Sequence, residues 1–315
     1  MKERKEFRKE REKHFENADH SFTAAVYGQP VHYMENGEWR EIDNTVELGA
    51  DGRYENKKND FKVSFAGDAS DEKLITVAKD GHSLSWKMMN ALKADVHPGK
   101  KPDTKKKKED MEVTGLHAAM AYKNVFDGMD LEYELRSKTL KENIVLNKPL
   151  VEGKVVFEIA TDLLPETDGG RVLFKTDEGE EIFVMAAPFM FDANGKESHA
   201  IEVLCERKRE AGKFLYTLIP NEKWLLSEER KWPVTIDPVI SSSMDYTKIY
   251  DVRLLSRYPN SQFGNDFKLI VGQDVSVGIA RSLVNFDLPE LHPADMVINA
   301  VLNLTCYSNY MQDCR

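Results

Sequence analysis

The stretch FDGMDLEYELRSKTLKENIVL, residues 126–146, is the most informative about the fold of this 315-residue chain. Within it, acidic and apolar side chains alternate strictly: Asp130, Leu131, Glu132, Tyr133, Glu134 and Leu135. Successive side chains of a β-strand point to opposite faces, so this pattern predicts a strand with an acidic solvent face and an apolar buried face. The same period of two recurs on both sides of this stretch.

Turn dipeptides separate the other short β patterns. Asn36-Gly37 and Asp80-Gly81 are each flanked by apolar-alternating runs, which predicts hairpins because these residues accept positive φ. Further β-rich runs are separated by Gly169-Gly170, Glu178-Gly179 and Asn194-Gly195 and lie at residues 154–159, 171–175, 181–185, 201–204 and 213–219. We therefore predict an all-β chain, with a large antiparallel β-sandwich region followed by an incomplete β-sandwich module.

Changes in composition divide the chain into five segments. Residues 1–18 form a charged lead, predicted to be helical or frayed because Glu6 with Lys9 and Glu10 with Lys13 are i,i+3 pairs. The remaining segments are a first β block, a lysine-rich exposed loop, a second β block and the terminal module, at residues 19–92, 93–112, 113–238 and 239–315. The two β blocks could form one large sandwich or two. A short helix is expected at residues 221–230, capped by Asn221 and ended by Pro233.

Charge and cysteine content restrict the class of protein. A net charge of -10 disfavours nonspecific nucleic-acid binding, which needs a basic surface. No run of about 18 apolar residues marks a membrane span, and no apolar segment follows Met1 as in a secretory signal. Cys205, Cys306 and Cys314 are too few for a disulfide framework, although the last two could pair. Cys205 alternates with apolar residues, as a small core side chain does.

Few residues suggest chemistry. One acidic set consists of Asp127, Asp130, Glu132 and Glu134. It could supply the carboxylate pair of a glycosidase, but its alternation with apolar residues favours the solvated face of a strand. Asp192, Asn194 and Glu197 could suggest a calcium loop, but Asn-Gly is more typical of a hairpin turn. The eight histidines follow no zinc spacing, and no nucleophile or phosphate-loop motif occurs. We predict no catalytic, cofactor or metal residues.

Several stretches in order resemble a family of secreted bacterial proteins. Residues 224–239, WLLSEERKWPVTIDPV, have the spacing found upstream of repeats in large surface proteins, and residues 251–304 resemble the first half of a DNRLRE domain. Residues 24–45, 126–146 and 188–195 also match DNRLRE and RHS/YD-repeat proteins. The matching positions, with structural roles, are Trp224, Arg230, Pro233, Asp237, Pro238, Asp251, Gly264, Gly272, Arg281 and Phe286. Arg253 departs from the pattern, which usually has an aromatic residue there.

The resemblance implies a noncatalytic extracellular scaffold, the N-terminal part of a large bacterial surface or secreted protein. Its expected partners are downstream repeats of the same polypeptide and cell-wall or other polysaccharide, with no nucleic acid, no cofactor and no membrane span. The alternative is an accessory carbohydrate-binding module of a polysaccharide-degrading enzyme. A stand-alone glycosidase that uses the acidic set is a third hypothesis. On the first hypothesis the chain is not an enzyme and is located outside the cell or on its surface.

Overall fold

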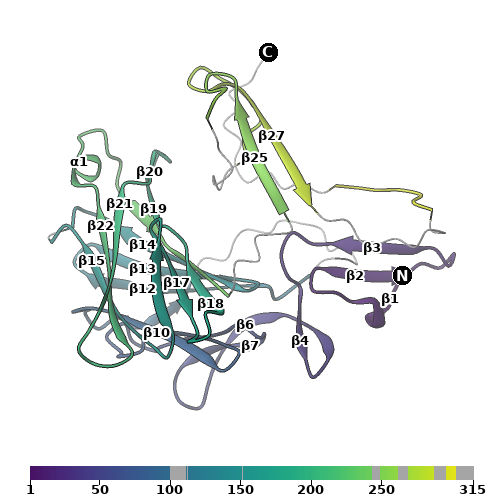
Figure 1. The fold of residues 1–315 in the computed structure, drawn as a ribbon, viewed down its shortest axis with the longest axis horizontal. Helices are drawn as coiled ribbons and strands as arrows, with labels where there is room; N and C mark the ends of the chain where they lie inside the picture. The colour runs from purple at the N-terminus through teal and green to yellow at the C-terminus, as the bar shows by residue number, and fades with distance from the viewer. Residues whose placement is uncertain are drawn as a thin grey trace.

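Antiparallel β-strands build almost all of the regular structure (Figure 1). The computed structural model describes residues 1–99, 111, 113–150, 152–242, 249–261, 269–286 and 296–302. The predicted all-β sandwich class is confirmed. No helix in these ranges is long and apolar enough to cross a membrane.

An eight-stranded sheet forms one layer of the sandwich. Its strands, in spatial order, are β21 (Ile201–Arg207), β22 (Lys213–Pro220), β15 (Val155–Thr161), β10 (His82–Met88), β9 (Ile75–Lys79), β8 (Lys62–Phe65), β7 (Tyr54–Lys58) and β6 (Asp43–Leu48). Strands from both predicted β blocks therefore share this sheet. The link between the two blocks in this sheet is the direct pairing of β10 with β15.

An eleven-stranded sheet forms the other layer. Its main path is β11 (Val96–Pro98), β12 (His117–Phe126), β13 (Met129–Arg136), β14 (Thr139–Leu146), β24 (Val239–Ser241), β18 (Glu181–Met185), β17 (Arg171–Lys175) and β16 (Leu164–Asp168). Three further strands pair beside it: β19 (Phe189–Asp192), β20 (Glu197–Ser198) and β23 (Val234–Asp237). Strand β11 lies inside the predicted lysine-rich loop, so the start of that segment is an edge strand. Residues 100–110 and 112 lie outside the described residues.

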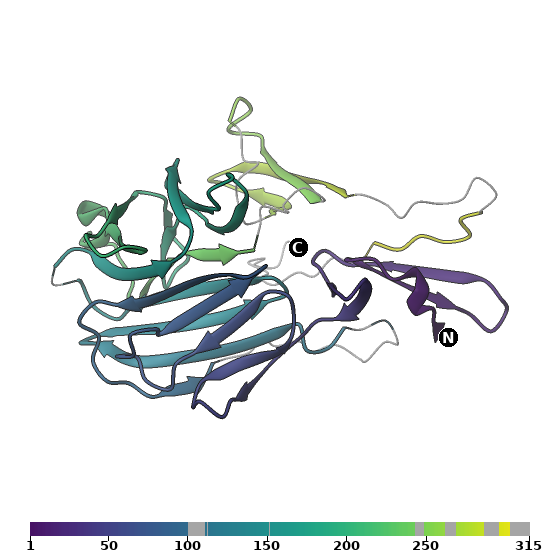
Figure 2. The same cartoon turned by 60° about the horizontal axis from the view of Figure 1, so that its bottom comes forward.

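One hydrophobic core fills the space between the two sheets, which Figure 2 shows stacked face to face. Tyr133 of β13 packs edge-on against Phe65 of β8, with ring centroids 5.9 Å apart. The alternation predicted for β13 is confirmed, because Leu131, Tyr133 and Leu135 are buried while their acidic neighbours point away. Burying side chains of this size stabilises the fold by about 1.5–3 kcal/mol each.

The charged lead forms strands, so the predicted helix is wrong. Strands β1 (Lys2–Glu3), β2 (Glu12–Glu16) and β3 (Phe22–Val26) form a three-stranded sheet, and η1 (Lys5–Phe7) is a single 3-10 turn. The charges pair between elements rather than along a helix: Arg8 binds Glu3, and Arg4 binds Glu16. Alternation in β2, with Phe15 buried, supplies the apolar face that a helix here would lack.

Local turn and cap predictions are confirmed. Strands β4 (His32–Glu35) and β5 (Glu38–Glu41) form a hairpin through Asn36 and Gly37, whose φ values are 52° and 80°. Asp80 and Gly81 turn between β9 and β10 in the same way. Helix α1 (Glu222–Leu225) begins after Asn221, whose side chain accepts a hydrogen bond from the Trp224 amide at 3.0 Å, but it is shorter than the predicted 221–230 and ends well before Pro233.

The terminal segment forms a separate three-stranded sheet, the terminal sheet. Its order is β25 (Ile249–Leu255), β27 (Gly278–Phe286) and β26 (Gly272–Asp274), and β25 and β27 stand clear of the sandwich in Figure 1. Gly272 has a φ of 136°, which favours glycine. Arg281 is exposed and lies opposite Leu254. Asp251 and Phe286 pair through their backbones with Val284 and Ile249, while Gly264, Cys306 and Cys314 lie outside the described residues.

Candidate functional site

The segment after helix α1 builds a buried clamp. Arg230 stacks over the Trp224 ring at 3.8 Å, and its Nε donates to the Trp224 carbonyl at 3.0 Å. Its Nη1 donates to Asp192 Oδ2 at 2.9 Å, and both side chains are almost fully buried. The clamp joins the segment after helix α1 to the end of β19, so the structure brings two of the predicted positions, Trp224 and Arg230, into contact.

The turn interpretation of residues 192–197 holds in the structure. Asp192 Oδ1 accepts hydrogen bonds from the amides of Asn194 and Lys196, each at 3.0 Å. Its Oδ2 accepts from Arg230 and from the Lys231 amide. Because each oxygen already accepts two hydrogen bonds from the protein, Asp192 stabilises a hairpin turn and has no lone pair left for a calcium ion.

Strand β23 is flanked by Pro233 and Pro238, and Asp237 is its last residue. The Trp232–Pro233 peptide is cis, and the Pro238 carbonyl accepts from the Glu142 amide at 2.9 Å. Asp237 is buried and accepts from Lys141 Nζ at 2.5 Å. Burial raises the pKa of the Asp237 carboxyl, and the Lys141 charge opposes that shift. These residues hold β23 against β14, away from Asp251, Gly272 and Arg281 in the terminal sheet.

The acidic row of β13 is occupied by ion pairs. Lys123 Nζ contacts Asp130 at 3.1 Å and Glu132 at 2.6 Å, while Arg136 contacts Glu134 at 2.5 Å. Asp127 pairs with Lys148 beyond the strand. Such ion pairs on the outer face of a sheet agree with the interpretation that these acids form the solvent-facing side of the strand.

A carboxyl group in the core escaped the sequence analysis. Glu142 accepts from the Tyr133 hydroxyl at 2.5 Å and from Trp86 Nε1 at 3.4 Å, beside a cavity of about 10 Å³ that Tyr216 also lines. Burial raises the pKa of Glu142 to about 7, although both hydrogen bonds lower it. The available signal was its position, because Glu142 alternates with the apolar Leu140 and Ile144 on the inner face of β14.

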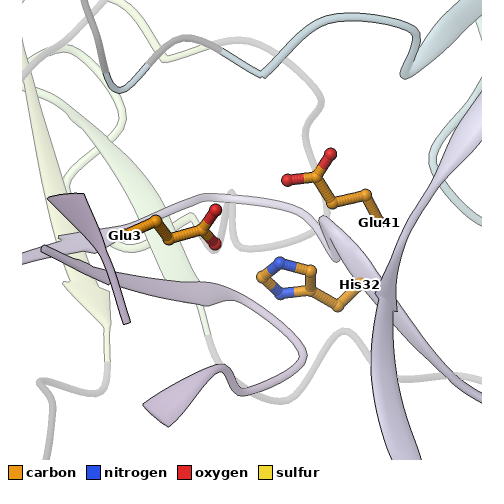
Figure 3. Close-up of side chains that lie close together, drawn as sticks. All are labelled: Glu3, His32 and Glu41. Atoms are coloured by element: carbon orange, nitrogen blue, oxygen red, sulfur yellow. The ribbon is translucent and has the colours of Figure 1, made fainter. Parts of the chain in front are cut away.

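A second overlooked cluster lies between the N-terminal sheet and the β4–β5 hairpin. Glu3, His32 and Glu41 place potential metal-binding atoms within 4.8 Å of one another (Figure 3). His32 is completely buried, and burial lowers its pKa, as do the charges of Arg8 and Lys13. The three residues lie far apart in sequence and follow no metal-binding spacing, so only the packing of the strands reveals them.

Cys205 is a half-buried free cysteine that packs against the sandwich core. Burial raises the pKa of its thiol to about 11, which keeps it protonated at neutral pH. This environment fits the predicted role as a small core side chain.

The fold is a two-sheet β-sandwich, and the chain is similar to bacterial proteins named as tRNA nucleases and to a wall-associated protein. The chain is 24% identical over 264 residues to tRNA3(Ser)-specific nuclease WapA of Bacillus spizizenii, covering 81% of this chain and 11% of that protein. The chain is also 24% identical to tRNA nuclease WapA of Bacillus subtilis, again over 81% of this chain and 11% of that protein. A wall-associated protein of Geobacillus stearothermophilus is 28% identical over 214 residues, covering 65% of this chain and 79% of that protein. No protein-family model and no solved structure matches the chain.

These relatives correct two predictions. The predictions that the chain is not an enzyme and has no nucleic-acid partner are contradicted by relatives named as tRNA nucleases. The net charge of -10 is that of this chain, which spans only 11% of the length of each nuclease relative. The similarity to a wall-associated protein supports the predicted cell-surface location.

Proposed function

We propose that this chain is the wall-associated β-sandwich portion of a large bacterial surface protein that, as a whole, acts on tRNA. The observation that carries the proposal is the extent of the similarity, which covers 81% of the chain in each nuclease relative and 65% in the wall-associated protein. The nuclease activity is assigned to the whole protein because the chain corresponds to a small share of those relatives.

The structure supports a mechanical role in such a protein. Two sheets enclose one core, and buried polar contacts such as Arg230–Asp192 resist separation of the loops from the sheets. A preformed, rigid module can hold further domains at the wall without an ordering cost on binding. We further propose that the sheet of β25, β26 and β27 is part of a DNRLRE-type module next to RHS/YD repeats, which rests on the resemblance of residues 251–304.

Wall fractionation of a tagged full-length protein tests the proposal. Deleting the sandwich should move most of the protein from the wall fraction to the soluble fractions, and the isolated chain should bind purified walls. The full-length protein, the deletion variant and the isolated chain are assayed in parallel for tRNA cleavage. Unchanged wall retention after the deletion would refute the wall role, and a full-length protein that leaves every tRNA intact would refute the assigned activity.

Point variants separate folding from wall contact. Asp192→Asn should loosen the clamp and lower wall retention, whereas Lys196→Gln removes an exposed charge of the same hairpin and should leave retention unchanged. Equal retention of both variants at a temperature where Asp192→Asn is unfolded would show that another part of the protein holds the wall.

A further inference from the structure

The imidazole of His32 is oriented toward two carboxylates. His32 Nδ1 lies 2.7 Å from the Lys9 carbonyl oxygen, so Nδ1 carries the proton and donates it there. Nε2 is then the unprotonated nitrogen, and in Figure 3 this side of the ring faces Glu3 and Glu41. Histidine ligands of metals are typically held in this manner, with the second ring nitrogen bonded to a backbone carbonyl.

Nε2 of His32 has no hydrogen-bond partner among the described residues, although the side chain is completely buried. An unsatisfied buried acceptor is destabilising relative to a satisfied one. The ring is held in place by its other nitrogen, so Nε2 stays aimed at the carboxylates. This unpaired lone pair is the observation that separates the cluster from an ordinary group of surface acids.

The two glutamates keep lone pairs available for a ligand. Both hydrogen bonds of Glu41 found in the described structure fall on Oε1, from Arg8 Nη2 at 2.9 Å and Lys13 Nζ at 2.7 Å, which leaves Oε2. Glu3 receives Arg8 on both oxygens, at 2.7 and 2.9 Å, and each oxygen retains a second lone pair. Arg8 therefore orients both carboxylates, the role that second-sphere residues play around metal sites.

We propose that Glu3, His32 and Glu41 form a binding site for a divalent transition-metal ion of the zinc class. One imidazole nitrogen and two carboxylate oxygens suit Zn²⁺, whereas Ca²⁺ and Mg²⁺ prefer oxygen ligands alone. Bond lengths of about 2.0–2.2 Å to zinc place its ligand atoms about 3.5 Å apart. The potential ligand atoms of the three residues lie within 4.8 Å of one another, so they must approach one another by about 1 Å to bind the ion. The Glu41 side chain is 49% exposed, which permits that movement and gives the ion a path from solvent.

Binding would connect two elements of the N-terminal region. Glu3 belongs to β1, while His32 and Glu41 lie at paired positions of β4 and β5. The charges of Arg8 and Lys13 oppose an incoming cation, so we expect micromolar affinity rather than the tight binding of structural zinc sites.

Zinc titration of the metal-free chain, in competition with a chromophoric chelator, tests the site. We expect saturable binding of one Zn²⁺ per chain, a rise in Tm with zinc, and no competition from excess Ca²⁺. His32→Gln and Glu41→Gln should each weaken binding at least tenfold. Because His32 is buried, Glu41→Gln at the half-exposed position provides the variant that keeps the fold, as checked by circular dichroism.

His20→Gln is the matched control. His20 also lies near a glutamate, Glu16, but its side chain is 88% exposed and it lies outside the proposed cluster. This variant should bind zinc like the unmodified chain. Absence of saturable binding at micromolar zinc, or equal affinity in the His32→Gln and Glu41→Gln variants and the unmodified chain, would overturn the proposal. Neither result bears on wall association or on tRNA cleavage, which are measured separately.

Discussion

Tyr133 donates its phenolic hydrogen to the Glu142 carboxylate at 2.5 Å, in the centre of the sandwich. The two residues are directly opposite on β13 and β14, so their side chains share the inner face. Trp86 reaches the same carboxylate oxygen from the opposite sheet at 3.4 Å. A single buried carboxyl thus connects both layers of the sandwich, which makes the protonation state of Glu142 important for stability.

We predict that the stability of the sandwich falls as the pH rises through neutrality. The folded pKa of Glu142 is about 7 and its ordinary value is 4.5. The folded state therefore binds more protons than the unfolded state between these values, and the free energy of unfolding decreases with rising pH. The full difference is about 3 kcal/mol, complete above the folded pKa. Urea unfolding between pH 5 and 8 measures it.

Glu142→Gln isolates this contribution. The amide cannot ionise, so the variant should lose most of the decrease between pH 5 and 8 and gain stability relative to the native chain at pH 8. Glu132→Gln on the outer face of the neighbouring strand is the control and should retain the native pH dependence. If both variants follow the native profile, Glu142 is not the group that titrates.

A second prediction concerns the Arg230–Asp192 clamp. Asp192→Asn should lower the free energy of unfolding by about 3–5 kcal/mol, because it leaves a buried guanidinium without its counter-charge. Lys196→Gln, which breaks the exposed Lys196–Glu229 pair of the same hairpin, should produce no measurable change. Chemical denaturation checks both, and a double-mutant cycle with Arg230→Met should show coupling. Independent, additive losses would contradict the clamp.

A third prediction concerns the buried amide of Asn44. Its Nδ2 donates to the carbonyls of Leu116 and Ser137 at 2.9 and 2.8 Å, and its Oδ1 accepts from Asn56 and Asn59, each at 2.9 Å. Asn44→Leu removes these four buried hydrogen bonds, while each partner keeps one other, and should cost about 2–4 kcal/mol. Thr45→Ala, at the exposed neighbouring position, should have little effect. A native-like Tm for Asn44→Leu would show that the network is dispensable.

A fourth prediction is that the terminal sheet of β25, β26 and β27 opens more readily than the sandwich. Leu254 and Leu283 are 47% and 58% exposed, whereas Tyr133 and Leu140 in β13 and β14 are almost completely buried. Amides with few buried neighbours exchange through low-energy local opening. Hydrogen exchange should therefore be faster in β25 and β27 than in β13 and β14. Equal protection would mean that the terminal sheet is stabilised by contacts that the exposure of its leucine side chains does not reveal.

Patterns that depend on adjacent residues were predictable. The alternation in residues 129–135 follows from the opposite directions of successive side chains, and the Asn36-Gly37 turn follows from the positive φ that both residues accept. The Asn221 cap is equally local, because it requires only an amide three residues later. The charged lead was mispredicted because the i,i+3 spacing of Glu6 and Lys9 says nothing about contacts between separate elements, such as that of Arg8 with Glu3 of β1.

The strand periodicity, the turns and the all-β class follow from the sequence alone, since each depends on backbone geometry over a few residues. Tertiary packing sets which strands become neighbours, and with them the Tyr133–Glu142 contact, the Arg230–Asp192 clamp and the Glu3–His32–Glu41 cluster. A period of two specifies which face a side chain occupies but not the residue opposite, because register and sheet order depend on packing across the whole core.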